Sequence, residues 1–162
     1  MRQAFERMLV YVDGSEGSIL AARLAAVLAS QTHAELHALA VVNTRALSDL
    51  VQAHIFLEAE REEYRRDMDE DATRYLRHAT EMGKRLGVYV EGHSVSGSIA
   101  AAIKNKALEI GADLLVMGPP PQIRSRRDAL YDEVETAMRT APCSVLVARD
   151  EERIEELYEQ LS

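Results

Sequence analysis

Five short apolar runs, separated by stretches with helical spacing, constrain the fold of this chain more than any other feature of its sequence. They span residues 8–12, 35–42, 88–95, 113–117 and 144–148. The runs at 8–12 and 113–117 are typical of strands buried on both faces of a parallel sheet, whereas 88–95 alternates loosely. Strands that alternate with helices predict an α/β protein with a single five-stranded parallel sheet, right-handed crossovers and helices on both faces.

The segments between these runs carry apolar residues three or four positions apart, which predicts helices. Residues 15–30, 98–110 and 132–140 each predict one helix. From Leu47 to Leu86 the same spacing passes through a dense charge run at 58–71, which is typical of a solvated helix face. The sequence leaves open whether this stretch forms one bent helix or two.

The end of the chain predicts a separate amphipathic helix. Ile154, Leu157, Tyr158 and Leu161 fall at positions i, i+3, i+4 and i+7 within a strongly acidic segment. We therefore expect residues 1–149 to form the domain and residues 150–162 to form an acidic amphipathic C-terminal helix. Its apolar stripe has to cover something, and we expect it to pack on the protein's own dimer or on another protein partner.

Length and charge exclude several classes of protein. The 162 residues fit one domain. Lysine and arginine number 19 against 27 aspartates and glutamates, and a net charge of −8 repels nucleic acid and acidic membranes. No apolar run approaches the roughly 18 residues needed to cross a bilayer. We therefore expect a cytoplasmic protein with no nucleic-acid partner and no membrane insertion.

Residues that often carry chemistry show no catalytic pattern. Cys143 is the single cysteine, so it forms no internal disulfide, and we expect a buried, inert thiol. The histidines show no metal-ligand spacing, so structural or surface roles are expected for His33, His37, His54, His78 and His93. No nucleophile elbow is present, and no catalytic or metal-binding residue is predicted.

Three local strings, in the right order along the chain, resemble the universal stress protein family. VYVDGSEGS at 10–18 looks like the family's first strand and turn, and GADLLVMG at 111–118 is similar to its fourth strand. APCSVLVAR at 141–149 resembles its last junction between helix and strand, and the likeness covers residues 7–149. The resemblance implies a Rossmann-like fold of the adenine nucleotide alpha hydrolase type, with strand order 3-2-1-4-5. It also implies a homodimer that pairs through the last strand.

Nucleotide-binding members of this family carry Gly-x-x-Gly, nine residues, and then Gly-Ser or Gly-Thr after the fourth strand. Gly118 matches the first glycine, but the other three positions hold Pro121, Tyr131 and Asp132. The resemblance also implies that Asp13 stands where the family has an acidic residue near the base and ribose. Val41 stands where the second strand lines the adenine pocket.

The chemistry of this loop opposes a phosphate. Anion cradles use successive backbone N–H donors, and the prolines at 119–121 have none. An ionised Asp132 can only accept hydrogen bonds, whereas a serine or threonine hydroxyl can donate one to a phosphate oxygen. Against this, Arg124, Arg126 and Arg127 follow the prolines, and guanidinium groups bind phosphate well.

Two functional hypotheses follow. The first is a non-catalytic stress-response or regulatory module that acts through protein contacts, uses no cofactor and does not bind ATP by the usual family loop. The alternative is a sensor of ATP, ADP or AMP, or a weak ATPase. That protein would keep Asp13, Val41 and Gly118 around the nucleotide and would use Arg124, Arg126 and Arg127 for phosphate.

Overall fold

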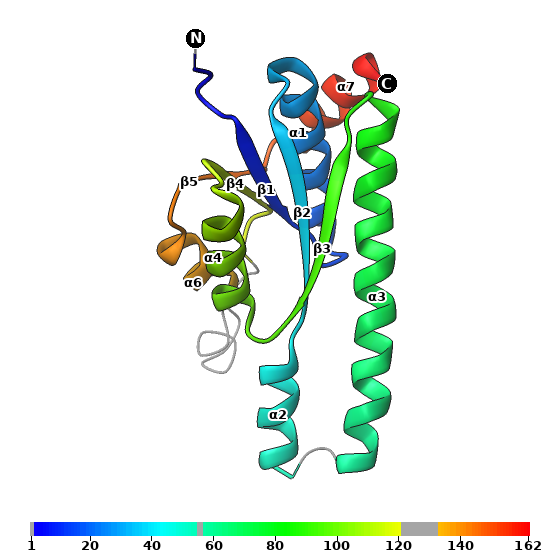
Figure 1. Cartoon of the computed structure of the whole chain (residues 1–162). Coiled ribbons are helices and arrows are strands. Elements are labelled where there is room, and N and C mark those ends of the chain that lie inside the picture. The colour runs from blue at the N-terminus through cyan, green and yellow to red at the C-terminus, as the bar shows by residue number, and fades with distance from the viewer. Residues whose placement is uncertain (1, 55–56, 121–132) are drawn as a thin grey trace.

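Five parallel strands form one sheet in the computed structural model, which describes residues 2–54, 57–120 and 133–162 (Figure 1). Within this part of the chain the strand order is β3-β2-β1-β4-β5, which confirms the expected order 3-2-1-4-5. The strands are β1 (Arg7–Tyr11), β2 (Glu35–Val42), β3 (Val90–Ser96), β4 (Leu114–Met117) and β5 (Ser144–Val147). In the central register, Met8 of β1 lies opposite Leu36 of β2 and Leu114 of β4.

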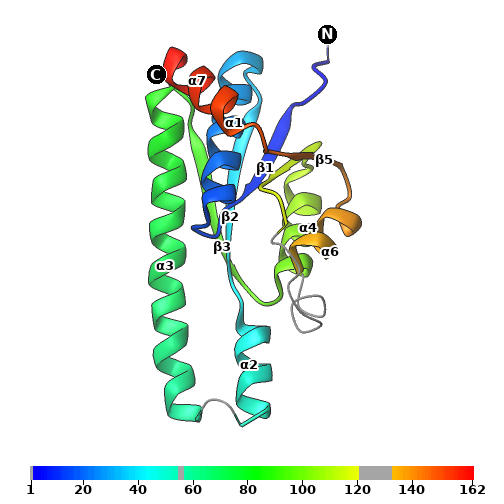
Figure 2. The same ribbon diagram turned by 180° about the vertical axis from the view of Figure 1, so that it is seen from behind.

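Helices cover both faces of the sheet, as the alternating pattern predicts (Figures 1 and 2). One face is covered by α1 (Glu16–Thr32) and α3 (Glu58–Arg85), and the other by α4 (Ile99–Ile110) and α6 (Glu133–Thr140). The remaining described helices are α2 (Thr44–Gln52) and α7 (Glu151–Leu161).

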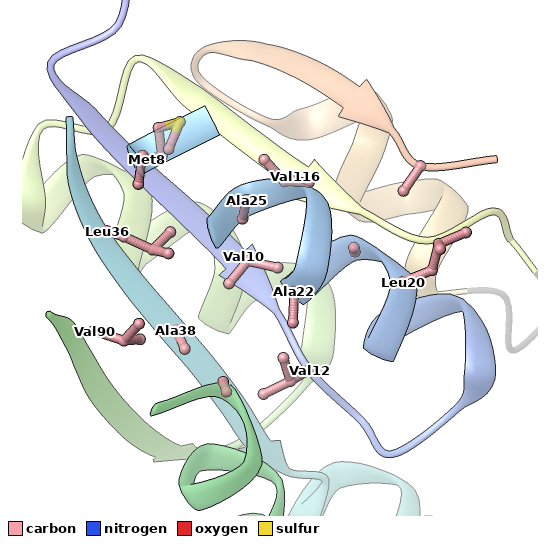
Figure 3. Packing of buried hydrophobic residues seen from close by; sticks show 14 of the residues in the cluster. Met8, Val10, Val12, Leu20, Ala22, Ala25, Leu36, Ala38, Val90 and Val116 are labelled. Carbon is pink, nitrogen blue, oxygen red and sulfur yellow. The ribbon is translucent and has the colours of Figure 1, made fainter. Parts of the chain in front are cut away.

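The central strand β1 is continuously apolar because both of its faces are buried. Met8 and Val10 pack toward α1, together with Leu36 of β2 and Val116 of β4 (Figure 3). Leu9 and Tyr11 point the other way, into the core beneath α4 and α6. Complete burial of such a side chain contributes about 1.5–3 kcal/mol relative to leaving it exposed. The packing of this strand therefore fixes where the carboxyl ends of β1 and its neighbour β4 lie.

The long helical stretch after β2 is two helices, α2 and α3. Helix α2 begins at Asn43, whose side-chain oxygen accepts a hydrogen bond from Ala46 N at 3.1 Å. It ends at Ala53, and His54 follows with a φ of 58°, in the left-handed region that turns the chain. Helix α3 then runs for 28 residues, so α2 and the first part of α3 extend well beyond the sheet (Figure 1).

Helix α7 packs on its own chain. Ile154 and Tyr158 are buried against α1, and the Tyr158 hydroxyl donates a 3.0 Å hydrogen bond to the carbonyl oxygen of Met82 in α3. Arg23 of α1 forms a 3.1 Å ion pair with Glu155. The chain has a helix where the sequence predicts one, and Ile154 and Tyr158 of its apolar stripe pack within the same chain.

In the part of the chain that the structure describes, no helix combines the length and the apolar character that crossing a membrane requires.

Candidate functional site

The carboxyl ends of β1 and β4 lie side by side, because these two strands are paired through Val10 and Val116. This is the point where the strand order reverses, and ligands of open α/β sheets bind at such points. A cavity of about 310 Å³ opens here, which we call the switch-point cavity. Its lining comes from Tyr11, Asp13, Ser15, Gly17, Ser18, Met117, Gly118, Pro119, Pro120 and Val134.

Asp13 shapes the loop that follows β1. Its carboxylate accepts hydrogen bonds from the backbone N–H and the hydroxyl of Ser15, the former at 3.0 Å. Ser15 in turn is the N-cap of α1 and accepts from Ser18 N, while the Ser18 hydroxyl oxygen accepts from Asp13 N. Short side chains that bond to nearby backbone are the ordinary chemistry of such turns. Asp13 therefore has a structural role here that does not depend on a ligand.

Gly118 is required by close packing of two backbones. A Cβ atom added at Gly118 would lie 2.5 Å from the carbonyl carbon of Gly17, in the first turn of α1. Pro119 also approaches this turn, because its Cδ would lie 3.2 Å from a Cβ on Gly17. The glycine that the sequence assigned to a phosphate loop therefore has a packing role of its own.

The wall of the cavity beyond Gly118 offers few hydrogen-bond donors. Pro119 and Pro120 line it, and proline has no backbone N–H. The backbone at the positions where a phosphate-binding loop would begin therefore cannot donate hydrogen bonds.

Glu133, at the start of α6, brings an internal carboxylate to this edge of the sheet. It accepts hydrogen bonds from the side-chain amide of Asn43 at 2.8 Å and from Ile99 N at 3.2 Å. Ile99 is the first residue of α4, and helix N-termini favour anions through their unpaired N–H groups. Glu133 thus occupies a position that an external anion could use. The sequence did not single out Glu133, because its partners are 90 and 34 residues away.

Burial and two nearby carboxylates act together on Tyr11. This side chain is buried, and burial, with Asp13 and then Glu133, raises the pKa of Tyr11 well above its usual value. The phenol is consequently neutral at physiological pH and able to donate a hydrogen bond.

The residues predicted for a nucleotide site are only partly brought together. Asp13 and Gly118 both line the switch-point cavity. Val41 is half-buried and packs in the core on the α4 side, and it is not among the described residues that line the cavity. The arginines at 124, 126 and 127 lie outside the described residues, as do Pro121, Tyr131 and Asp132.

A second cavity, of about 240 Å³, lies between α1 and α3 on the other side of the loop after β1. Tyr75 of α3 is packed over Gly14 there, so a Cβ at Gly14 would lie 2.3 Å from the Tyr75 ring. Gly14 has a φ of 79°, so both its backbone conformation and this contact require glycine. Asp13-Gly14 therefore forms the turn that the sequence predicts.

Comparisons with known proteins agree with the fold and with the family resemblance. Residues 4–149 match the model of the universal stress protein family. Universal stress protein YxiE of Bacillus subtilis is 31% identical over 152 residues, which cover 90% of this chain and 99% of that protein.

Two solved structures are similar in fold. One is a universal stress protein in complex with cAMP, with a TM-score of 0.68 and 24% identity over 91% of this chain and 99% of that chain. The other is the universal stress protein from Archaeoglobus fulgidus in complex with dAMP, with a TM-score of 0.63 and 14% identity over 91% of this chain and all (100%) of that chain.

Proposed function

The chain belongs to the universal stress protein family, and from this premise we propose that it is a non-catalytic, homodimeric cytoplasmic module of stress response or regulation. It acts through protein contacts and does not hold ATP by the usual family loop. The observation that carries this proposal is the wall of the switch-point cavity. Directly after Gly118, where phosphate would need backbone donors, Pro119 and Pro120 have none.

The charges around the cavity support the same proposal. Asp13 lines the cavity, and Glu133 stands close enough to raise the pKa of Tyr11 together with it. A nucleotide triphosphate brings several negative charges, and like charges at short range in a partly buried site are costly. The lack of backbone donors and the two carboxylates therefore both oppose the binding of a nucleotide triphosphate.

Calorimetric titration of the purified full chain with ATP tests this proposal. We expect no binding in the micromolar range. Micromolar binding that Asp13→Asn abolishes would contradict it, since that change keeps the shape of the side chain and removes its charge. Asp49→Asn, at an exposed position of α2, is the matched control for loss of one carboxylate.

A nucleotide-binding sensor or weak ATPase is the second candidate, and one observation favours it. The structure leaves a 310 Å³ cavity with Asp13 and Gly118 in its wall, and two proteins of similar fold were solved with cAMP and dAMP. In this case Arg124, Arg126 and Arg127 would supply the phosphate contacts that the prolines cannot.

Mass spectrometry of gently purified protein separates the two candidates. Copurified ATP, ADP or AMP that disappears when the three arginines at 124, 126 and 127 are changed to glutamine would support the sensor. Nucleotide-free protein, together with no ATP binding in the calorimetric titration, supports the first proposal.

We also propose that the dimer forms through β5. This strand lies at an edge of the described sheet, and Val145, Leu146 and Val147 are only half-buried in the isolated chain. An exposed apolar edge strand tends to pair with another strand. Light scattering should give twice the mass of one chain, and Val147→Lys should shift it toward the monomer. Leu108→Lys, at a position 59% exposed on α4, is the control. A monomeric wild type at tens of micromolar would overturn the proposal.

A further inference from the structure

Two histidines that the sequence treated as unrelated meet on the sheet. His37 of β2 and His93 of β3 are 56 residues apart in sequence, yet His37 Nδ1 and His93 Nε2 are separated by 2.9 Å. Glu91 Oε2 lies 3.4 Å from the same His37 Nδ1. The strand register explains the cluster. His37 lies opposite Glu91 and Leu39 opposite His93, so all three side chains project from one face.

The spacing of these three atoms suits a divalent metal ion. Nitrogen and oxygen ligands of Zn²⁺ lie about 2.0–2.2 Å from the metal, which places neighbouring ligands of a tetrahedral site about 3.4 Å apart. The potential ligand atoms of His37, Glu91 and His93 all lie within 4.8 Å of one another. Two imidazoles and a carboxylate are also a ligand set that zinc uses in proteins, with water in the fourth position.

Metal binding requires a small movement of one ring. The two rings are nearly parallel, at 15°, with centroids 5.2 Å apart, so the facing nitrogens share one hydrogen. A metal in its place needs the 2.9 Å separation to widen by about 0.5 Å, given tetrahedral geometry. His93 can turn to allow this, because it is only half-buried and sits on a strand at the edge of the described sheet.

The other nitrogen of His37 provides an independent argument. His37 is 5% exposed, and its Nε2 is buried without a hydrogen-bond partner in the described structure. The nearest carboxylate oxygen is Glu35 Oε2, at 3.7 Å. Coordination through Nδ1 would place the ring proton on Nε2, facing this carboxylate. Metal-binding histidines commonly donate their second N–H to a carboxylate in this way.

Two nearby cationic side chains are each paired with a carboxylate, which limits their repulsion of a metal ion. Arg7, on the neighbouring strand, forms a 3.2 Å ion pair with Glu35. Lys106 of α4 is paired with Glu109 at 2.9 Å, so its charge is partly compensated.

We propose that His37, Glu91 and His93 bind a divalent transition-metal ion of the Zn²⁺ type, with Glu35 orienting His37. The site lies on the α4 face of β2 and β3, and about half of the Glu91 side chain is exposed, so solvent offers a path of entry. Its ligand atoms come from two adjacent strands rather than from one motif.

The test uses the full chain, stripped of metal with a chelator and titrated with Zn²⁺ alone in competition with a chromophoric chelator. We expect one Zn²⁺ per chain and a rise in melting temperature on binding, because the metal binds the folded state. His93→Asn should weaken the Zn²⁺ affinity by about tenfold or more, since losing even a residue that only hydrogen-bonds to a metal ligand often has an effect of this size. Glu91→Gln, at an exposed position, should weaken it as well.

His78→Asn is the matched control, since His78 is an exposed histidine on α3. Circular dichroism of the metal-free variants checks that each one folds. Substitution with Co²⁺ adds a second readout, because the visible spectrum of bound Co²⁺ should change in His93→Asn and not in His78→Asn. Absence of binding by the wild type, or equal Zn²⁺ affinity in the wild type and all three variants, would overturn the proposal and indicate adventitious surface binding only.

Discussion

Gly118→Ala separates a packing role of this glycine from a phosphate-binding role. The added methyl group would lie 2.5, 2.6 and 2.9 Å from three backbone atoms of Gly17, so either β4 or α1 must shift. Overpacking of this kind costs about 1–3 kcal/mol. Replacing glycine by alanine also restricts the unfolded chain, which stabilises by about 0.4–1 kcal/mol. We expect a net loss of about 1.3 kcal/mol in the free energy of unfolding, the difference between the middle values of these two effects.

Urea denaturation, with linear extrapolation to zero denaturant, measures this loss. Gly92→Ala is the matched control, because its Cβ would meet Leu76 at 3.6 Å, an ordinary contact, in a strand without a positive φ. That variant should be neutral or slightly more stable than the wild type. If Gly118→Ala keeps full stability and instead changes nucleotide binding, the packing explanation is wrong.

Three further outcomes follow from single contacts. Ile154→Ala should cost about 2–5 kcal/mol in urea denaturation, because this buried side chain docks α7, whereas exposed Glu156→Ala should stay within about 0.5 kcal/mol. Half-buried Cys143 should react with iodoacetamide more slowly than a free peptide thiol at pH 8 and accelerate at higher pH, because burial raises its thiol pKa; equal rates would refute this. Glu133→Ala should lower the free energy of unfolding by about 1–3 kcal/mol. Glu133→Gln should lower it less, since glutamine keeps one acceptor for Asn43 or for the N-terminus of α4. Equal losses for the two variants in thermal unfolding would contradict the role of these contacts.

The local sequence pattern predicts the strands well, because strands that are buried on both faces have apolar sequences. The run at 113–117 contains all of β4, whose residues Leu114–Met117 are buried on both faces. The order of the strands came from the family resemblance instead, since apolar content does not say which strands are neighbours. The break between α2 and α3 was left open for a physical reason. Residues 53–57 contain no glycine or proline, and the chain turns through His54 in a left-handed conformation.

The candidate sites were harder to predict because they depend on contacts between distant segments. Asp13 and Gly118 could be placed side by side from the family's strand order. The pairing of His37 with His93 follows only from the register of β2 against β3, and a shift of one residue would turn His93 to the other face. The contacts of Glu133 depend in the same way on where α6 begins relative to α4.

The two candidate sites lie at opposite ends of β2, and this separation makes their tests independent. His37 is near the start of the strand, whereas Asn43, which holds Glu133, directly follows its end. Six residues of extended chain span about 20 Å. Changes this far apart and without shared partners usually act additively.

We therefore expect Glu133→Gln to leave the Zn²⁺ affinity unchanged and His93→Asn to leave the effect of Glu133→Gln on thermal unfolding unchanged. The double variant, measured in both assays, completes the cycle. Strand β2 and helix α4 both reach the two sites, α4 through the hydrogen bond of Ile99 N to Glu133 and through the charge of Lys106, which acts on His93. A coupling above about 0.5 kcal/mol would mean that the two sites are not independent and have to be treated as one linked system.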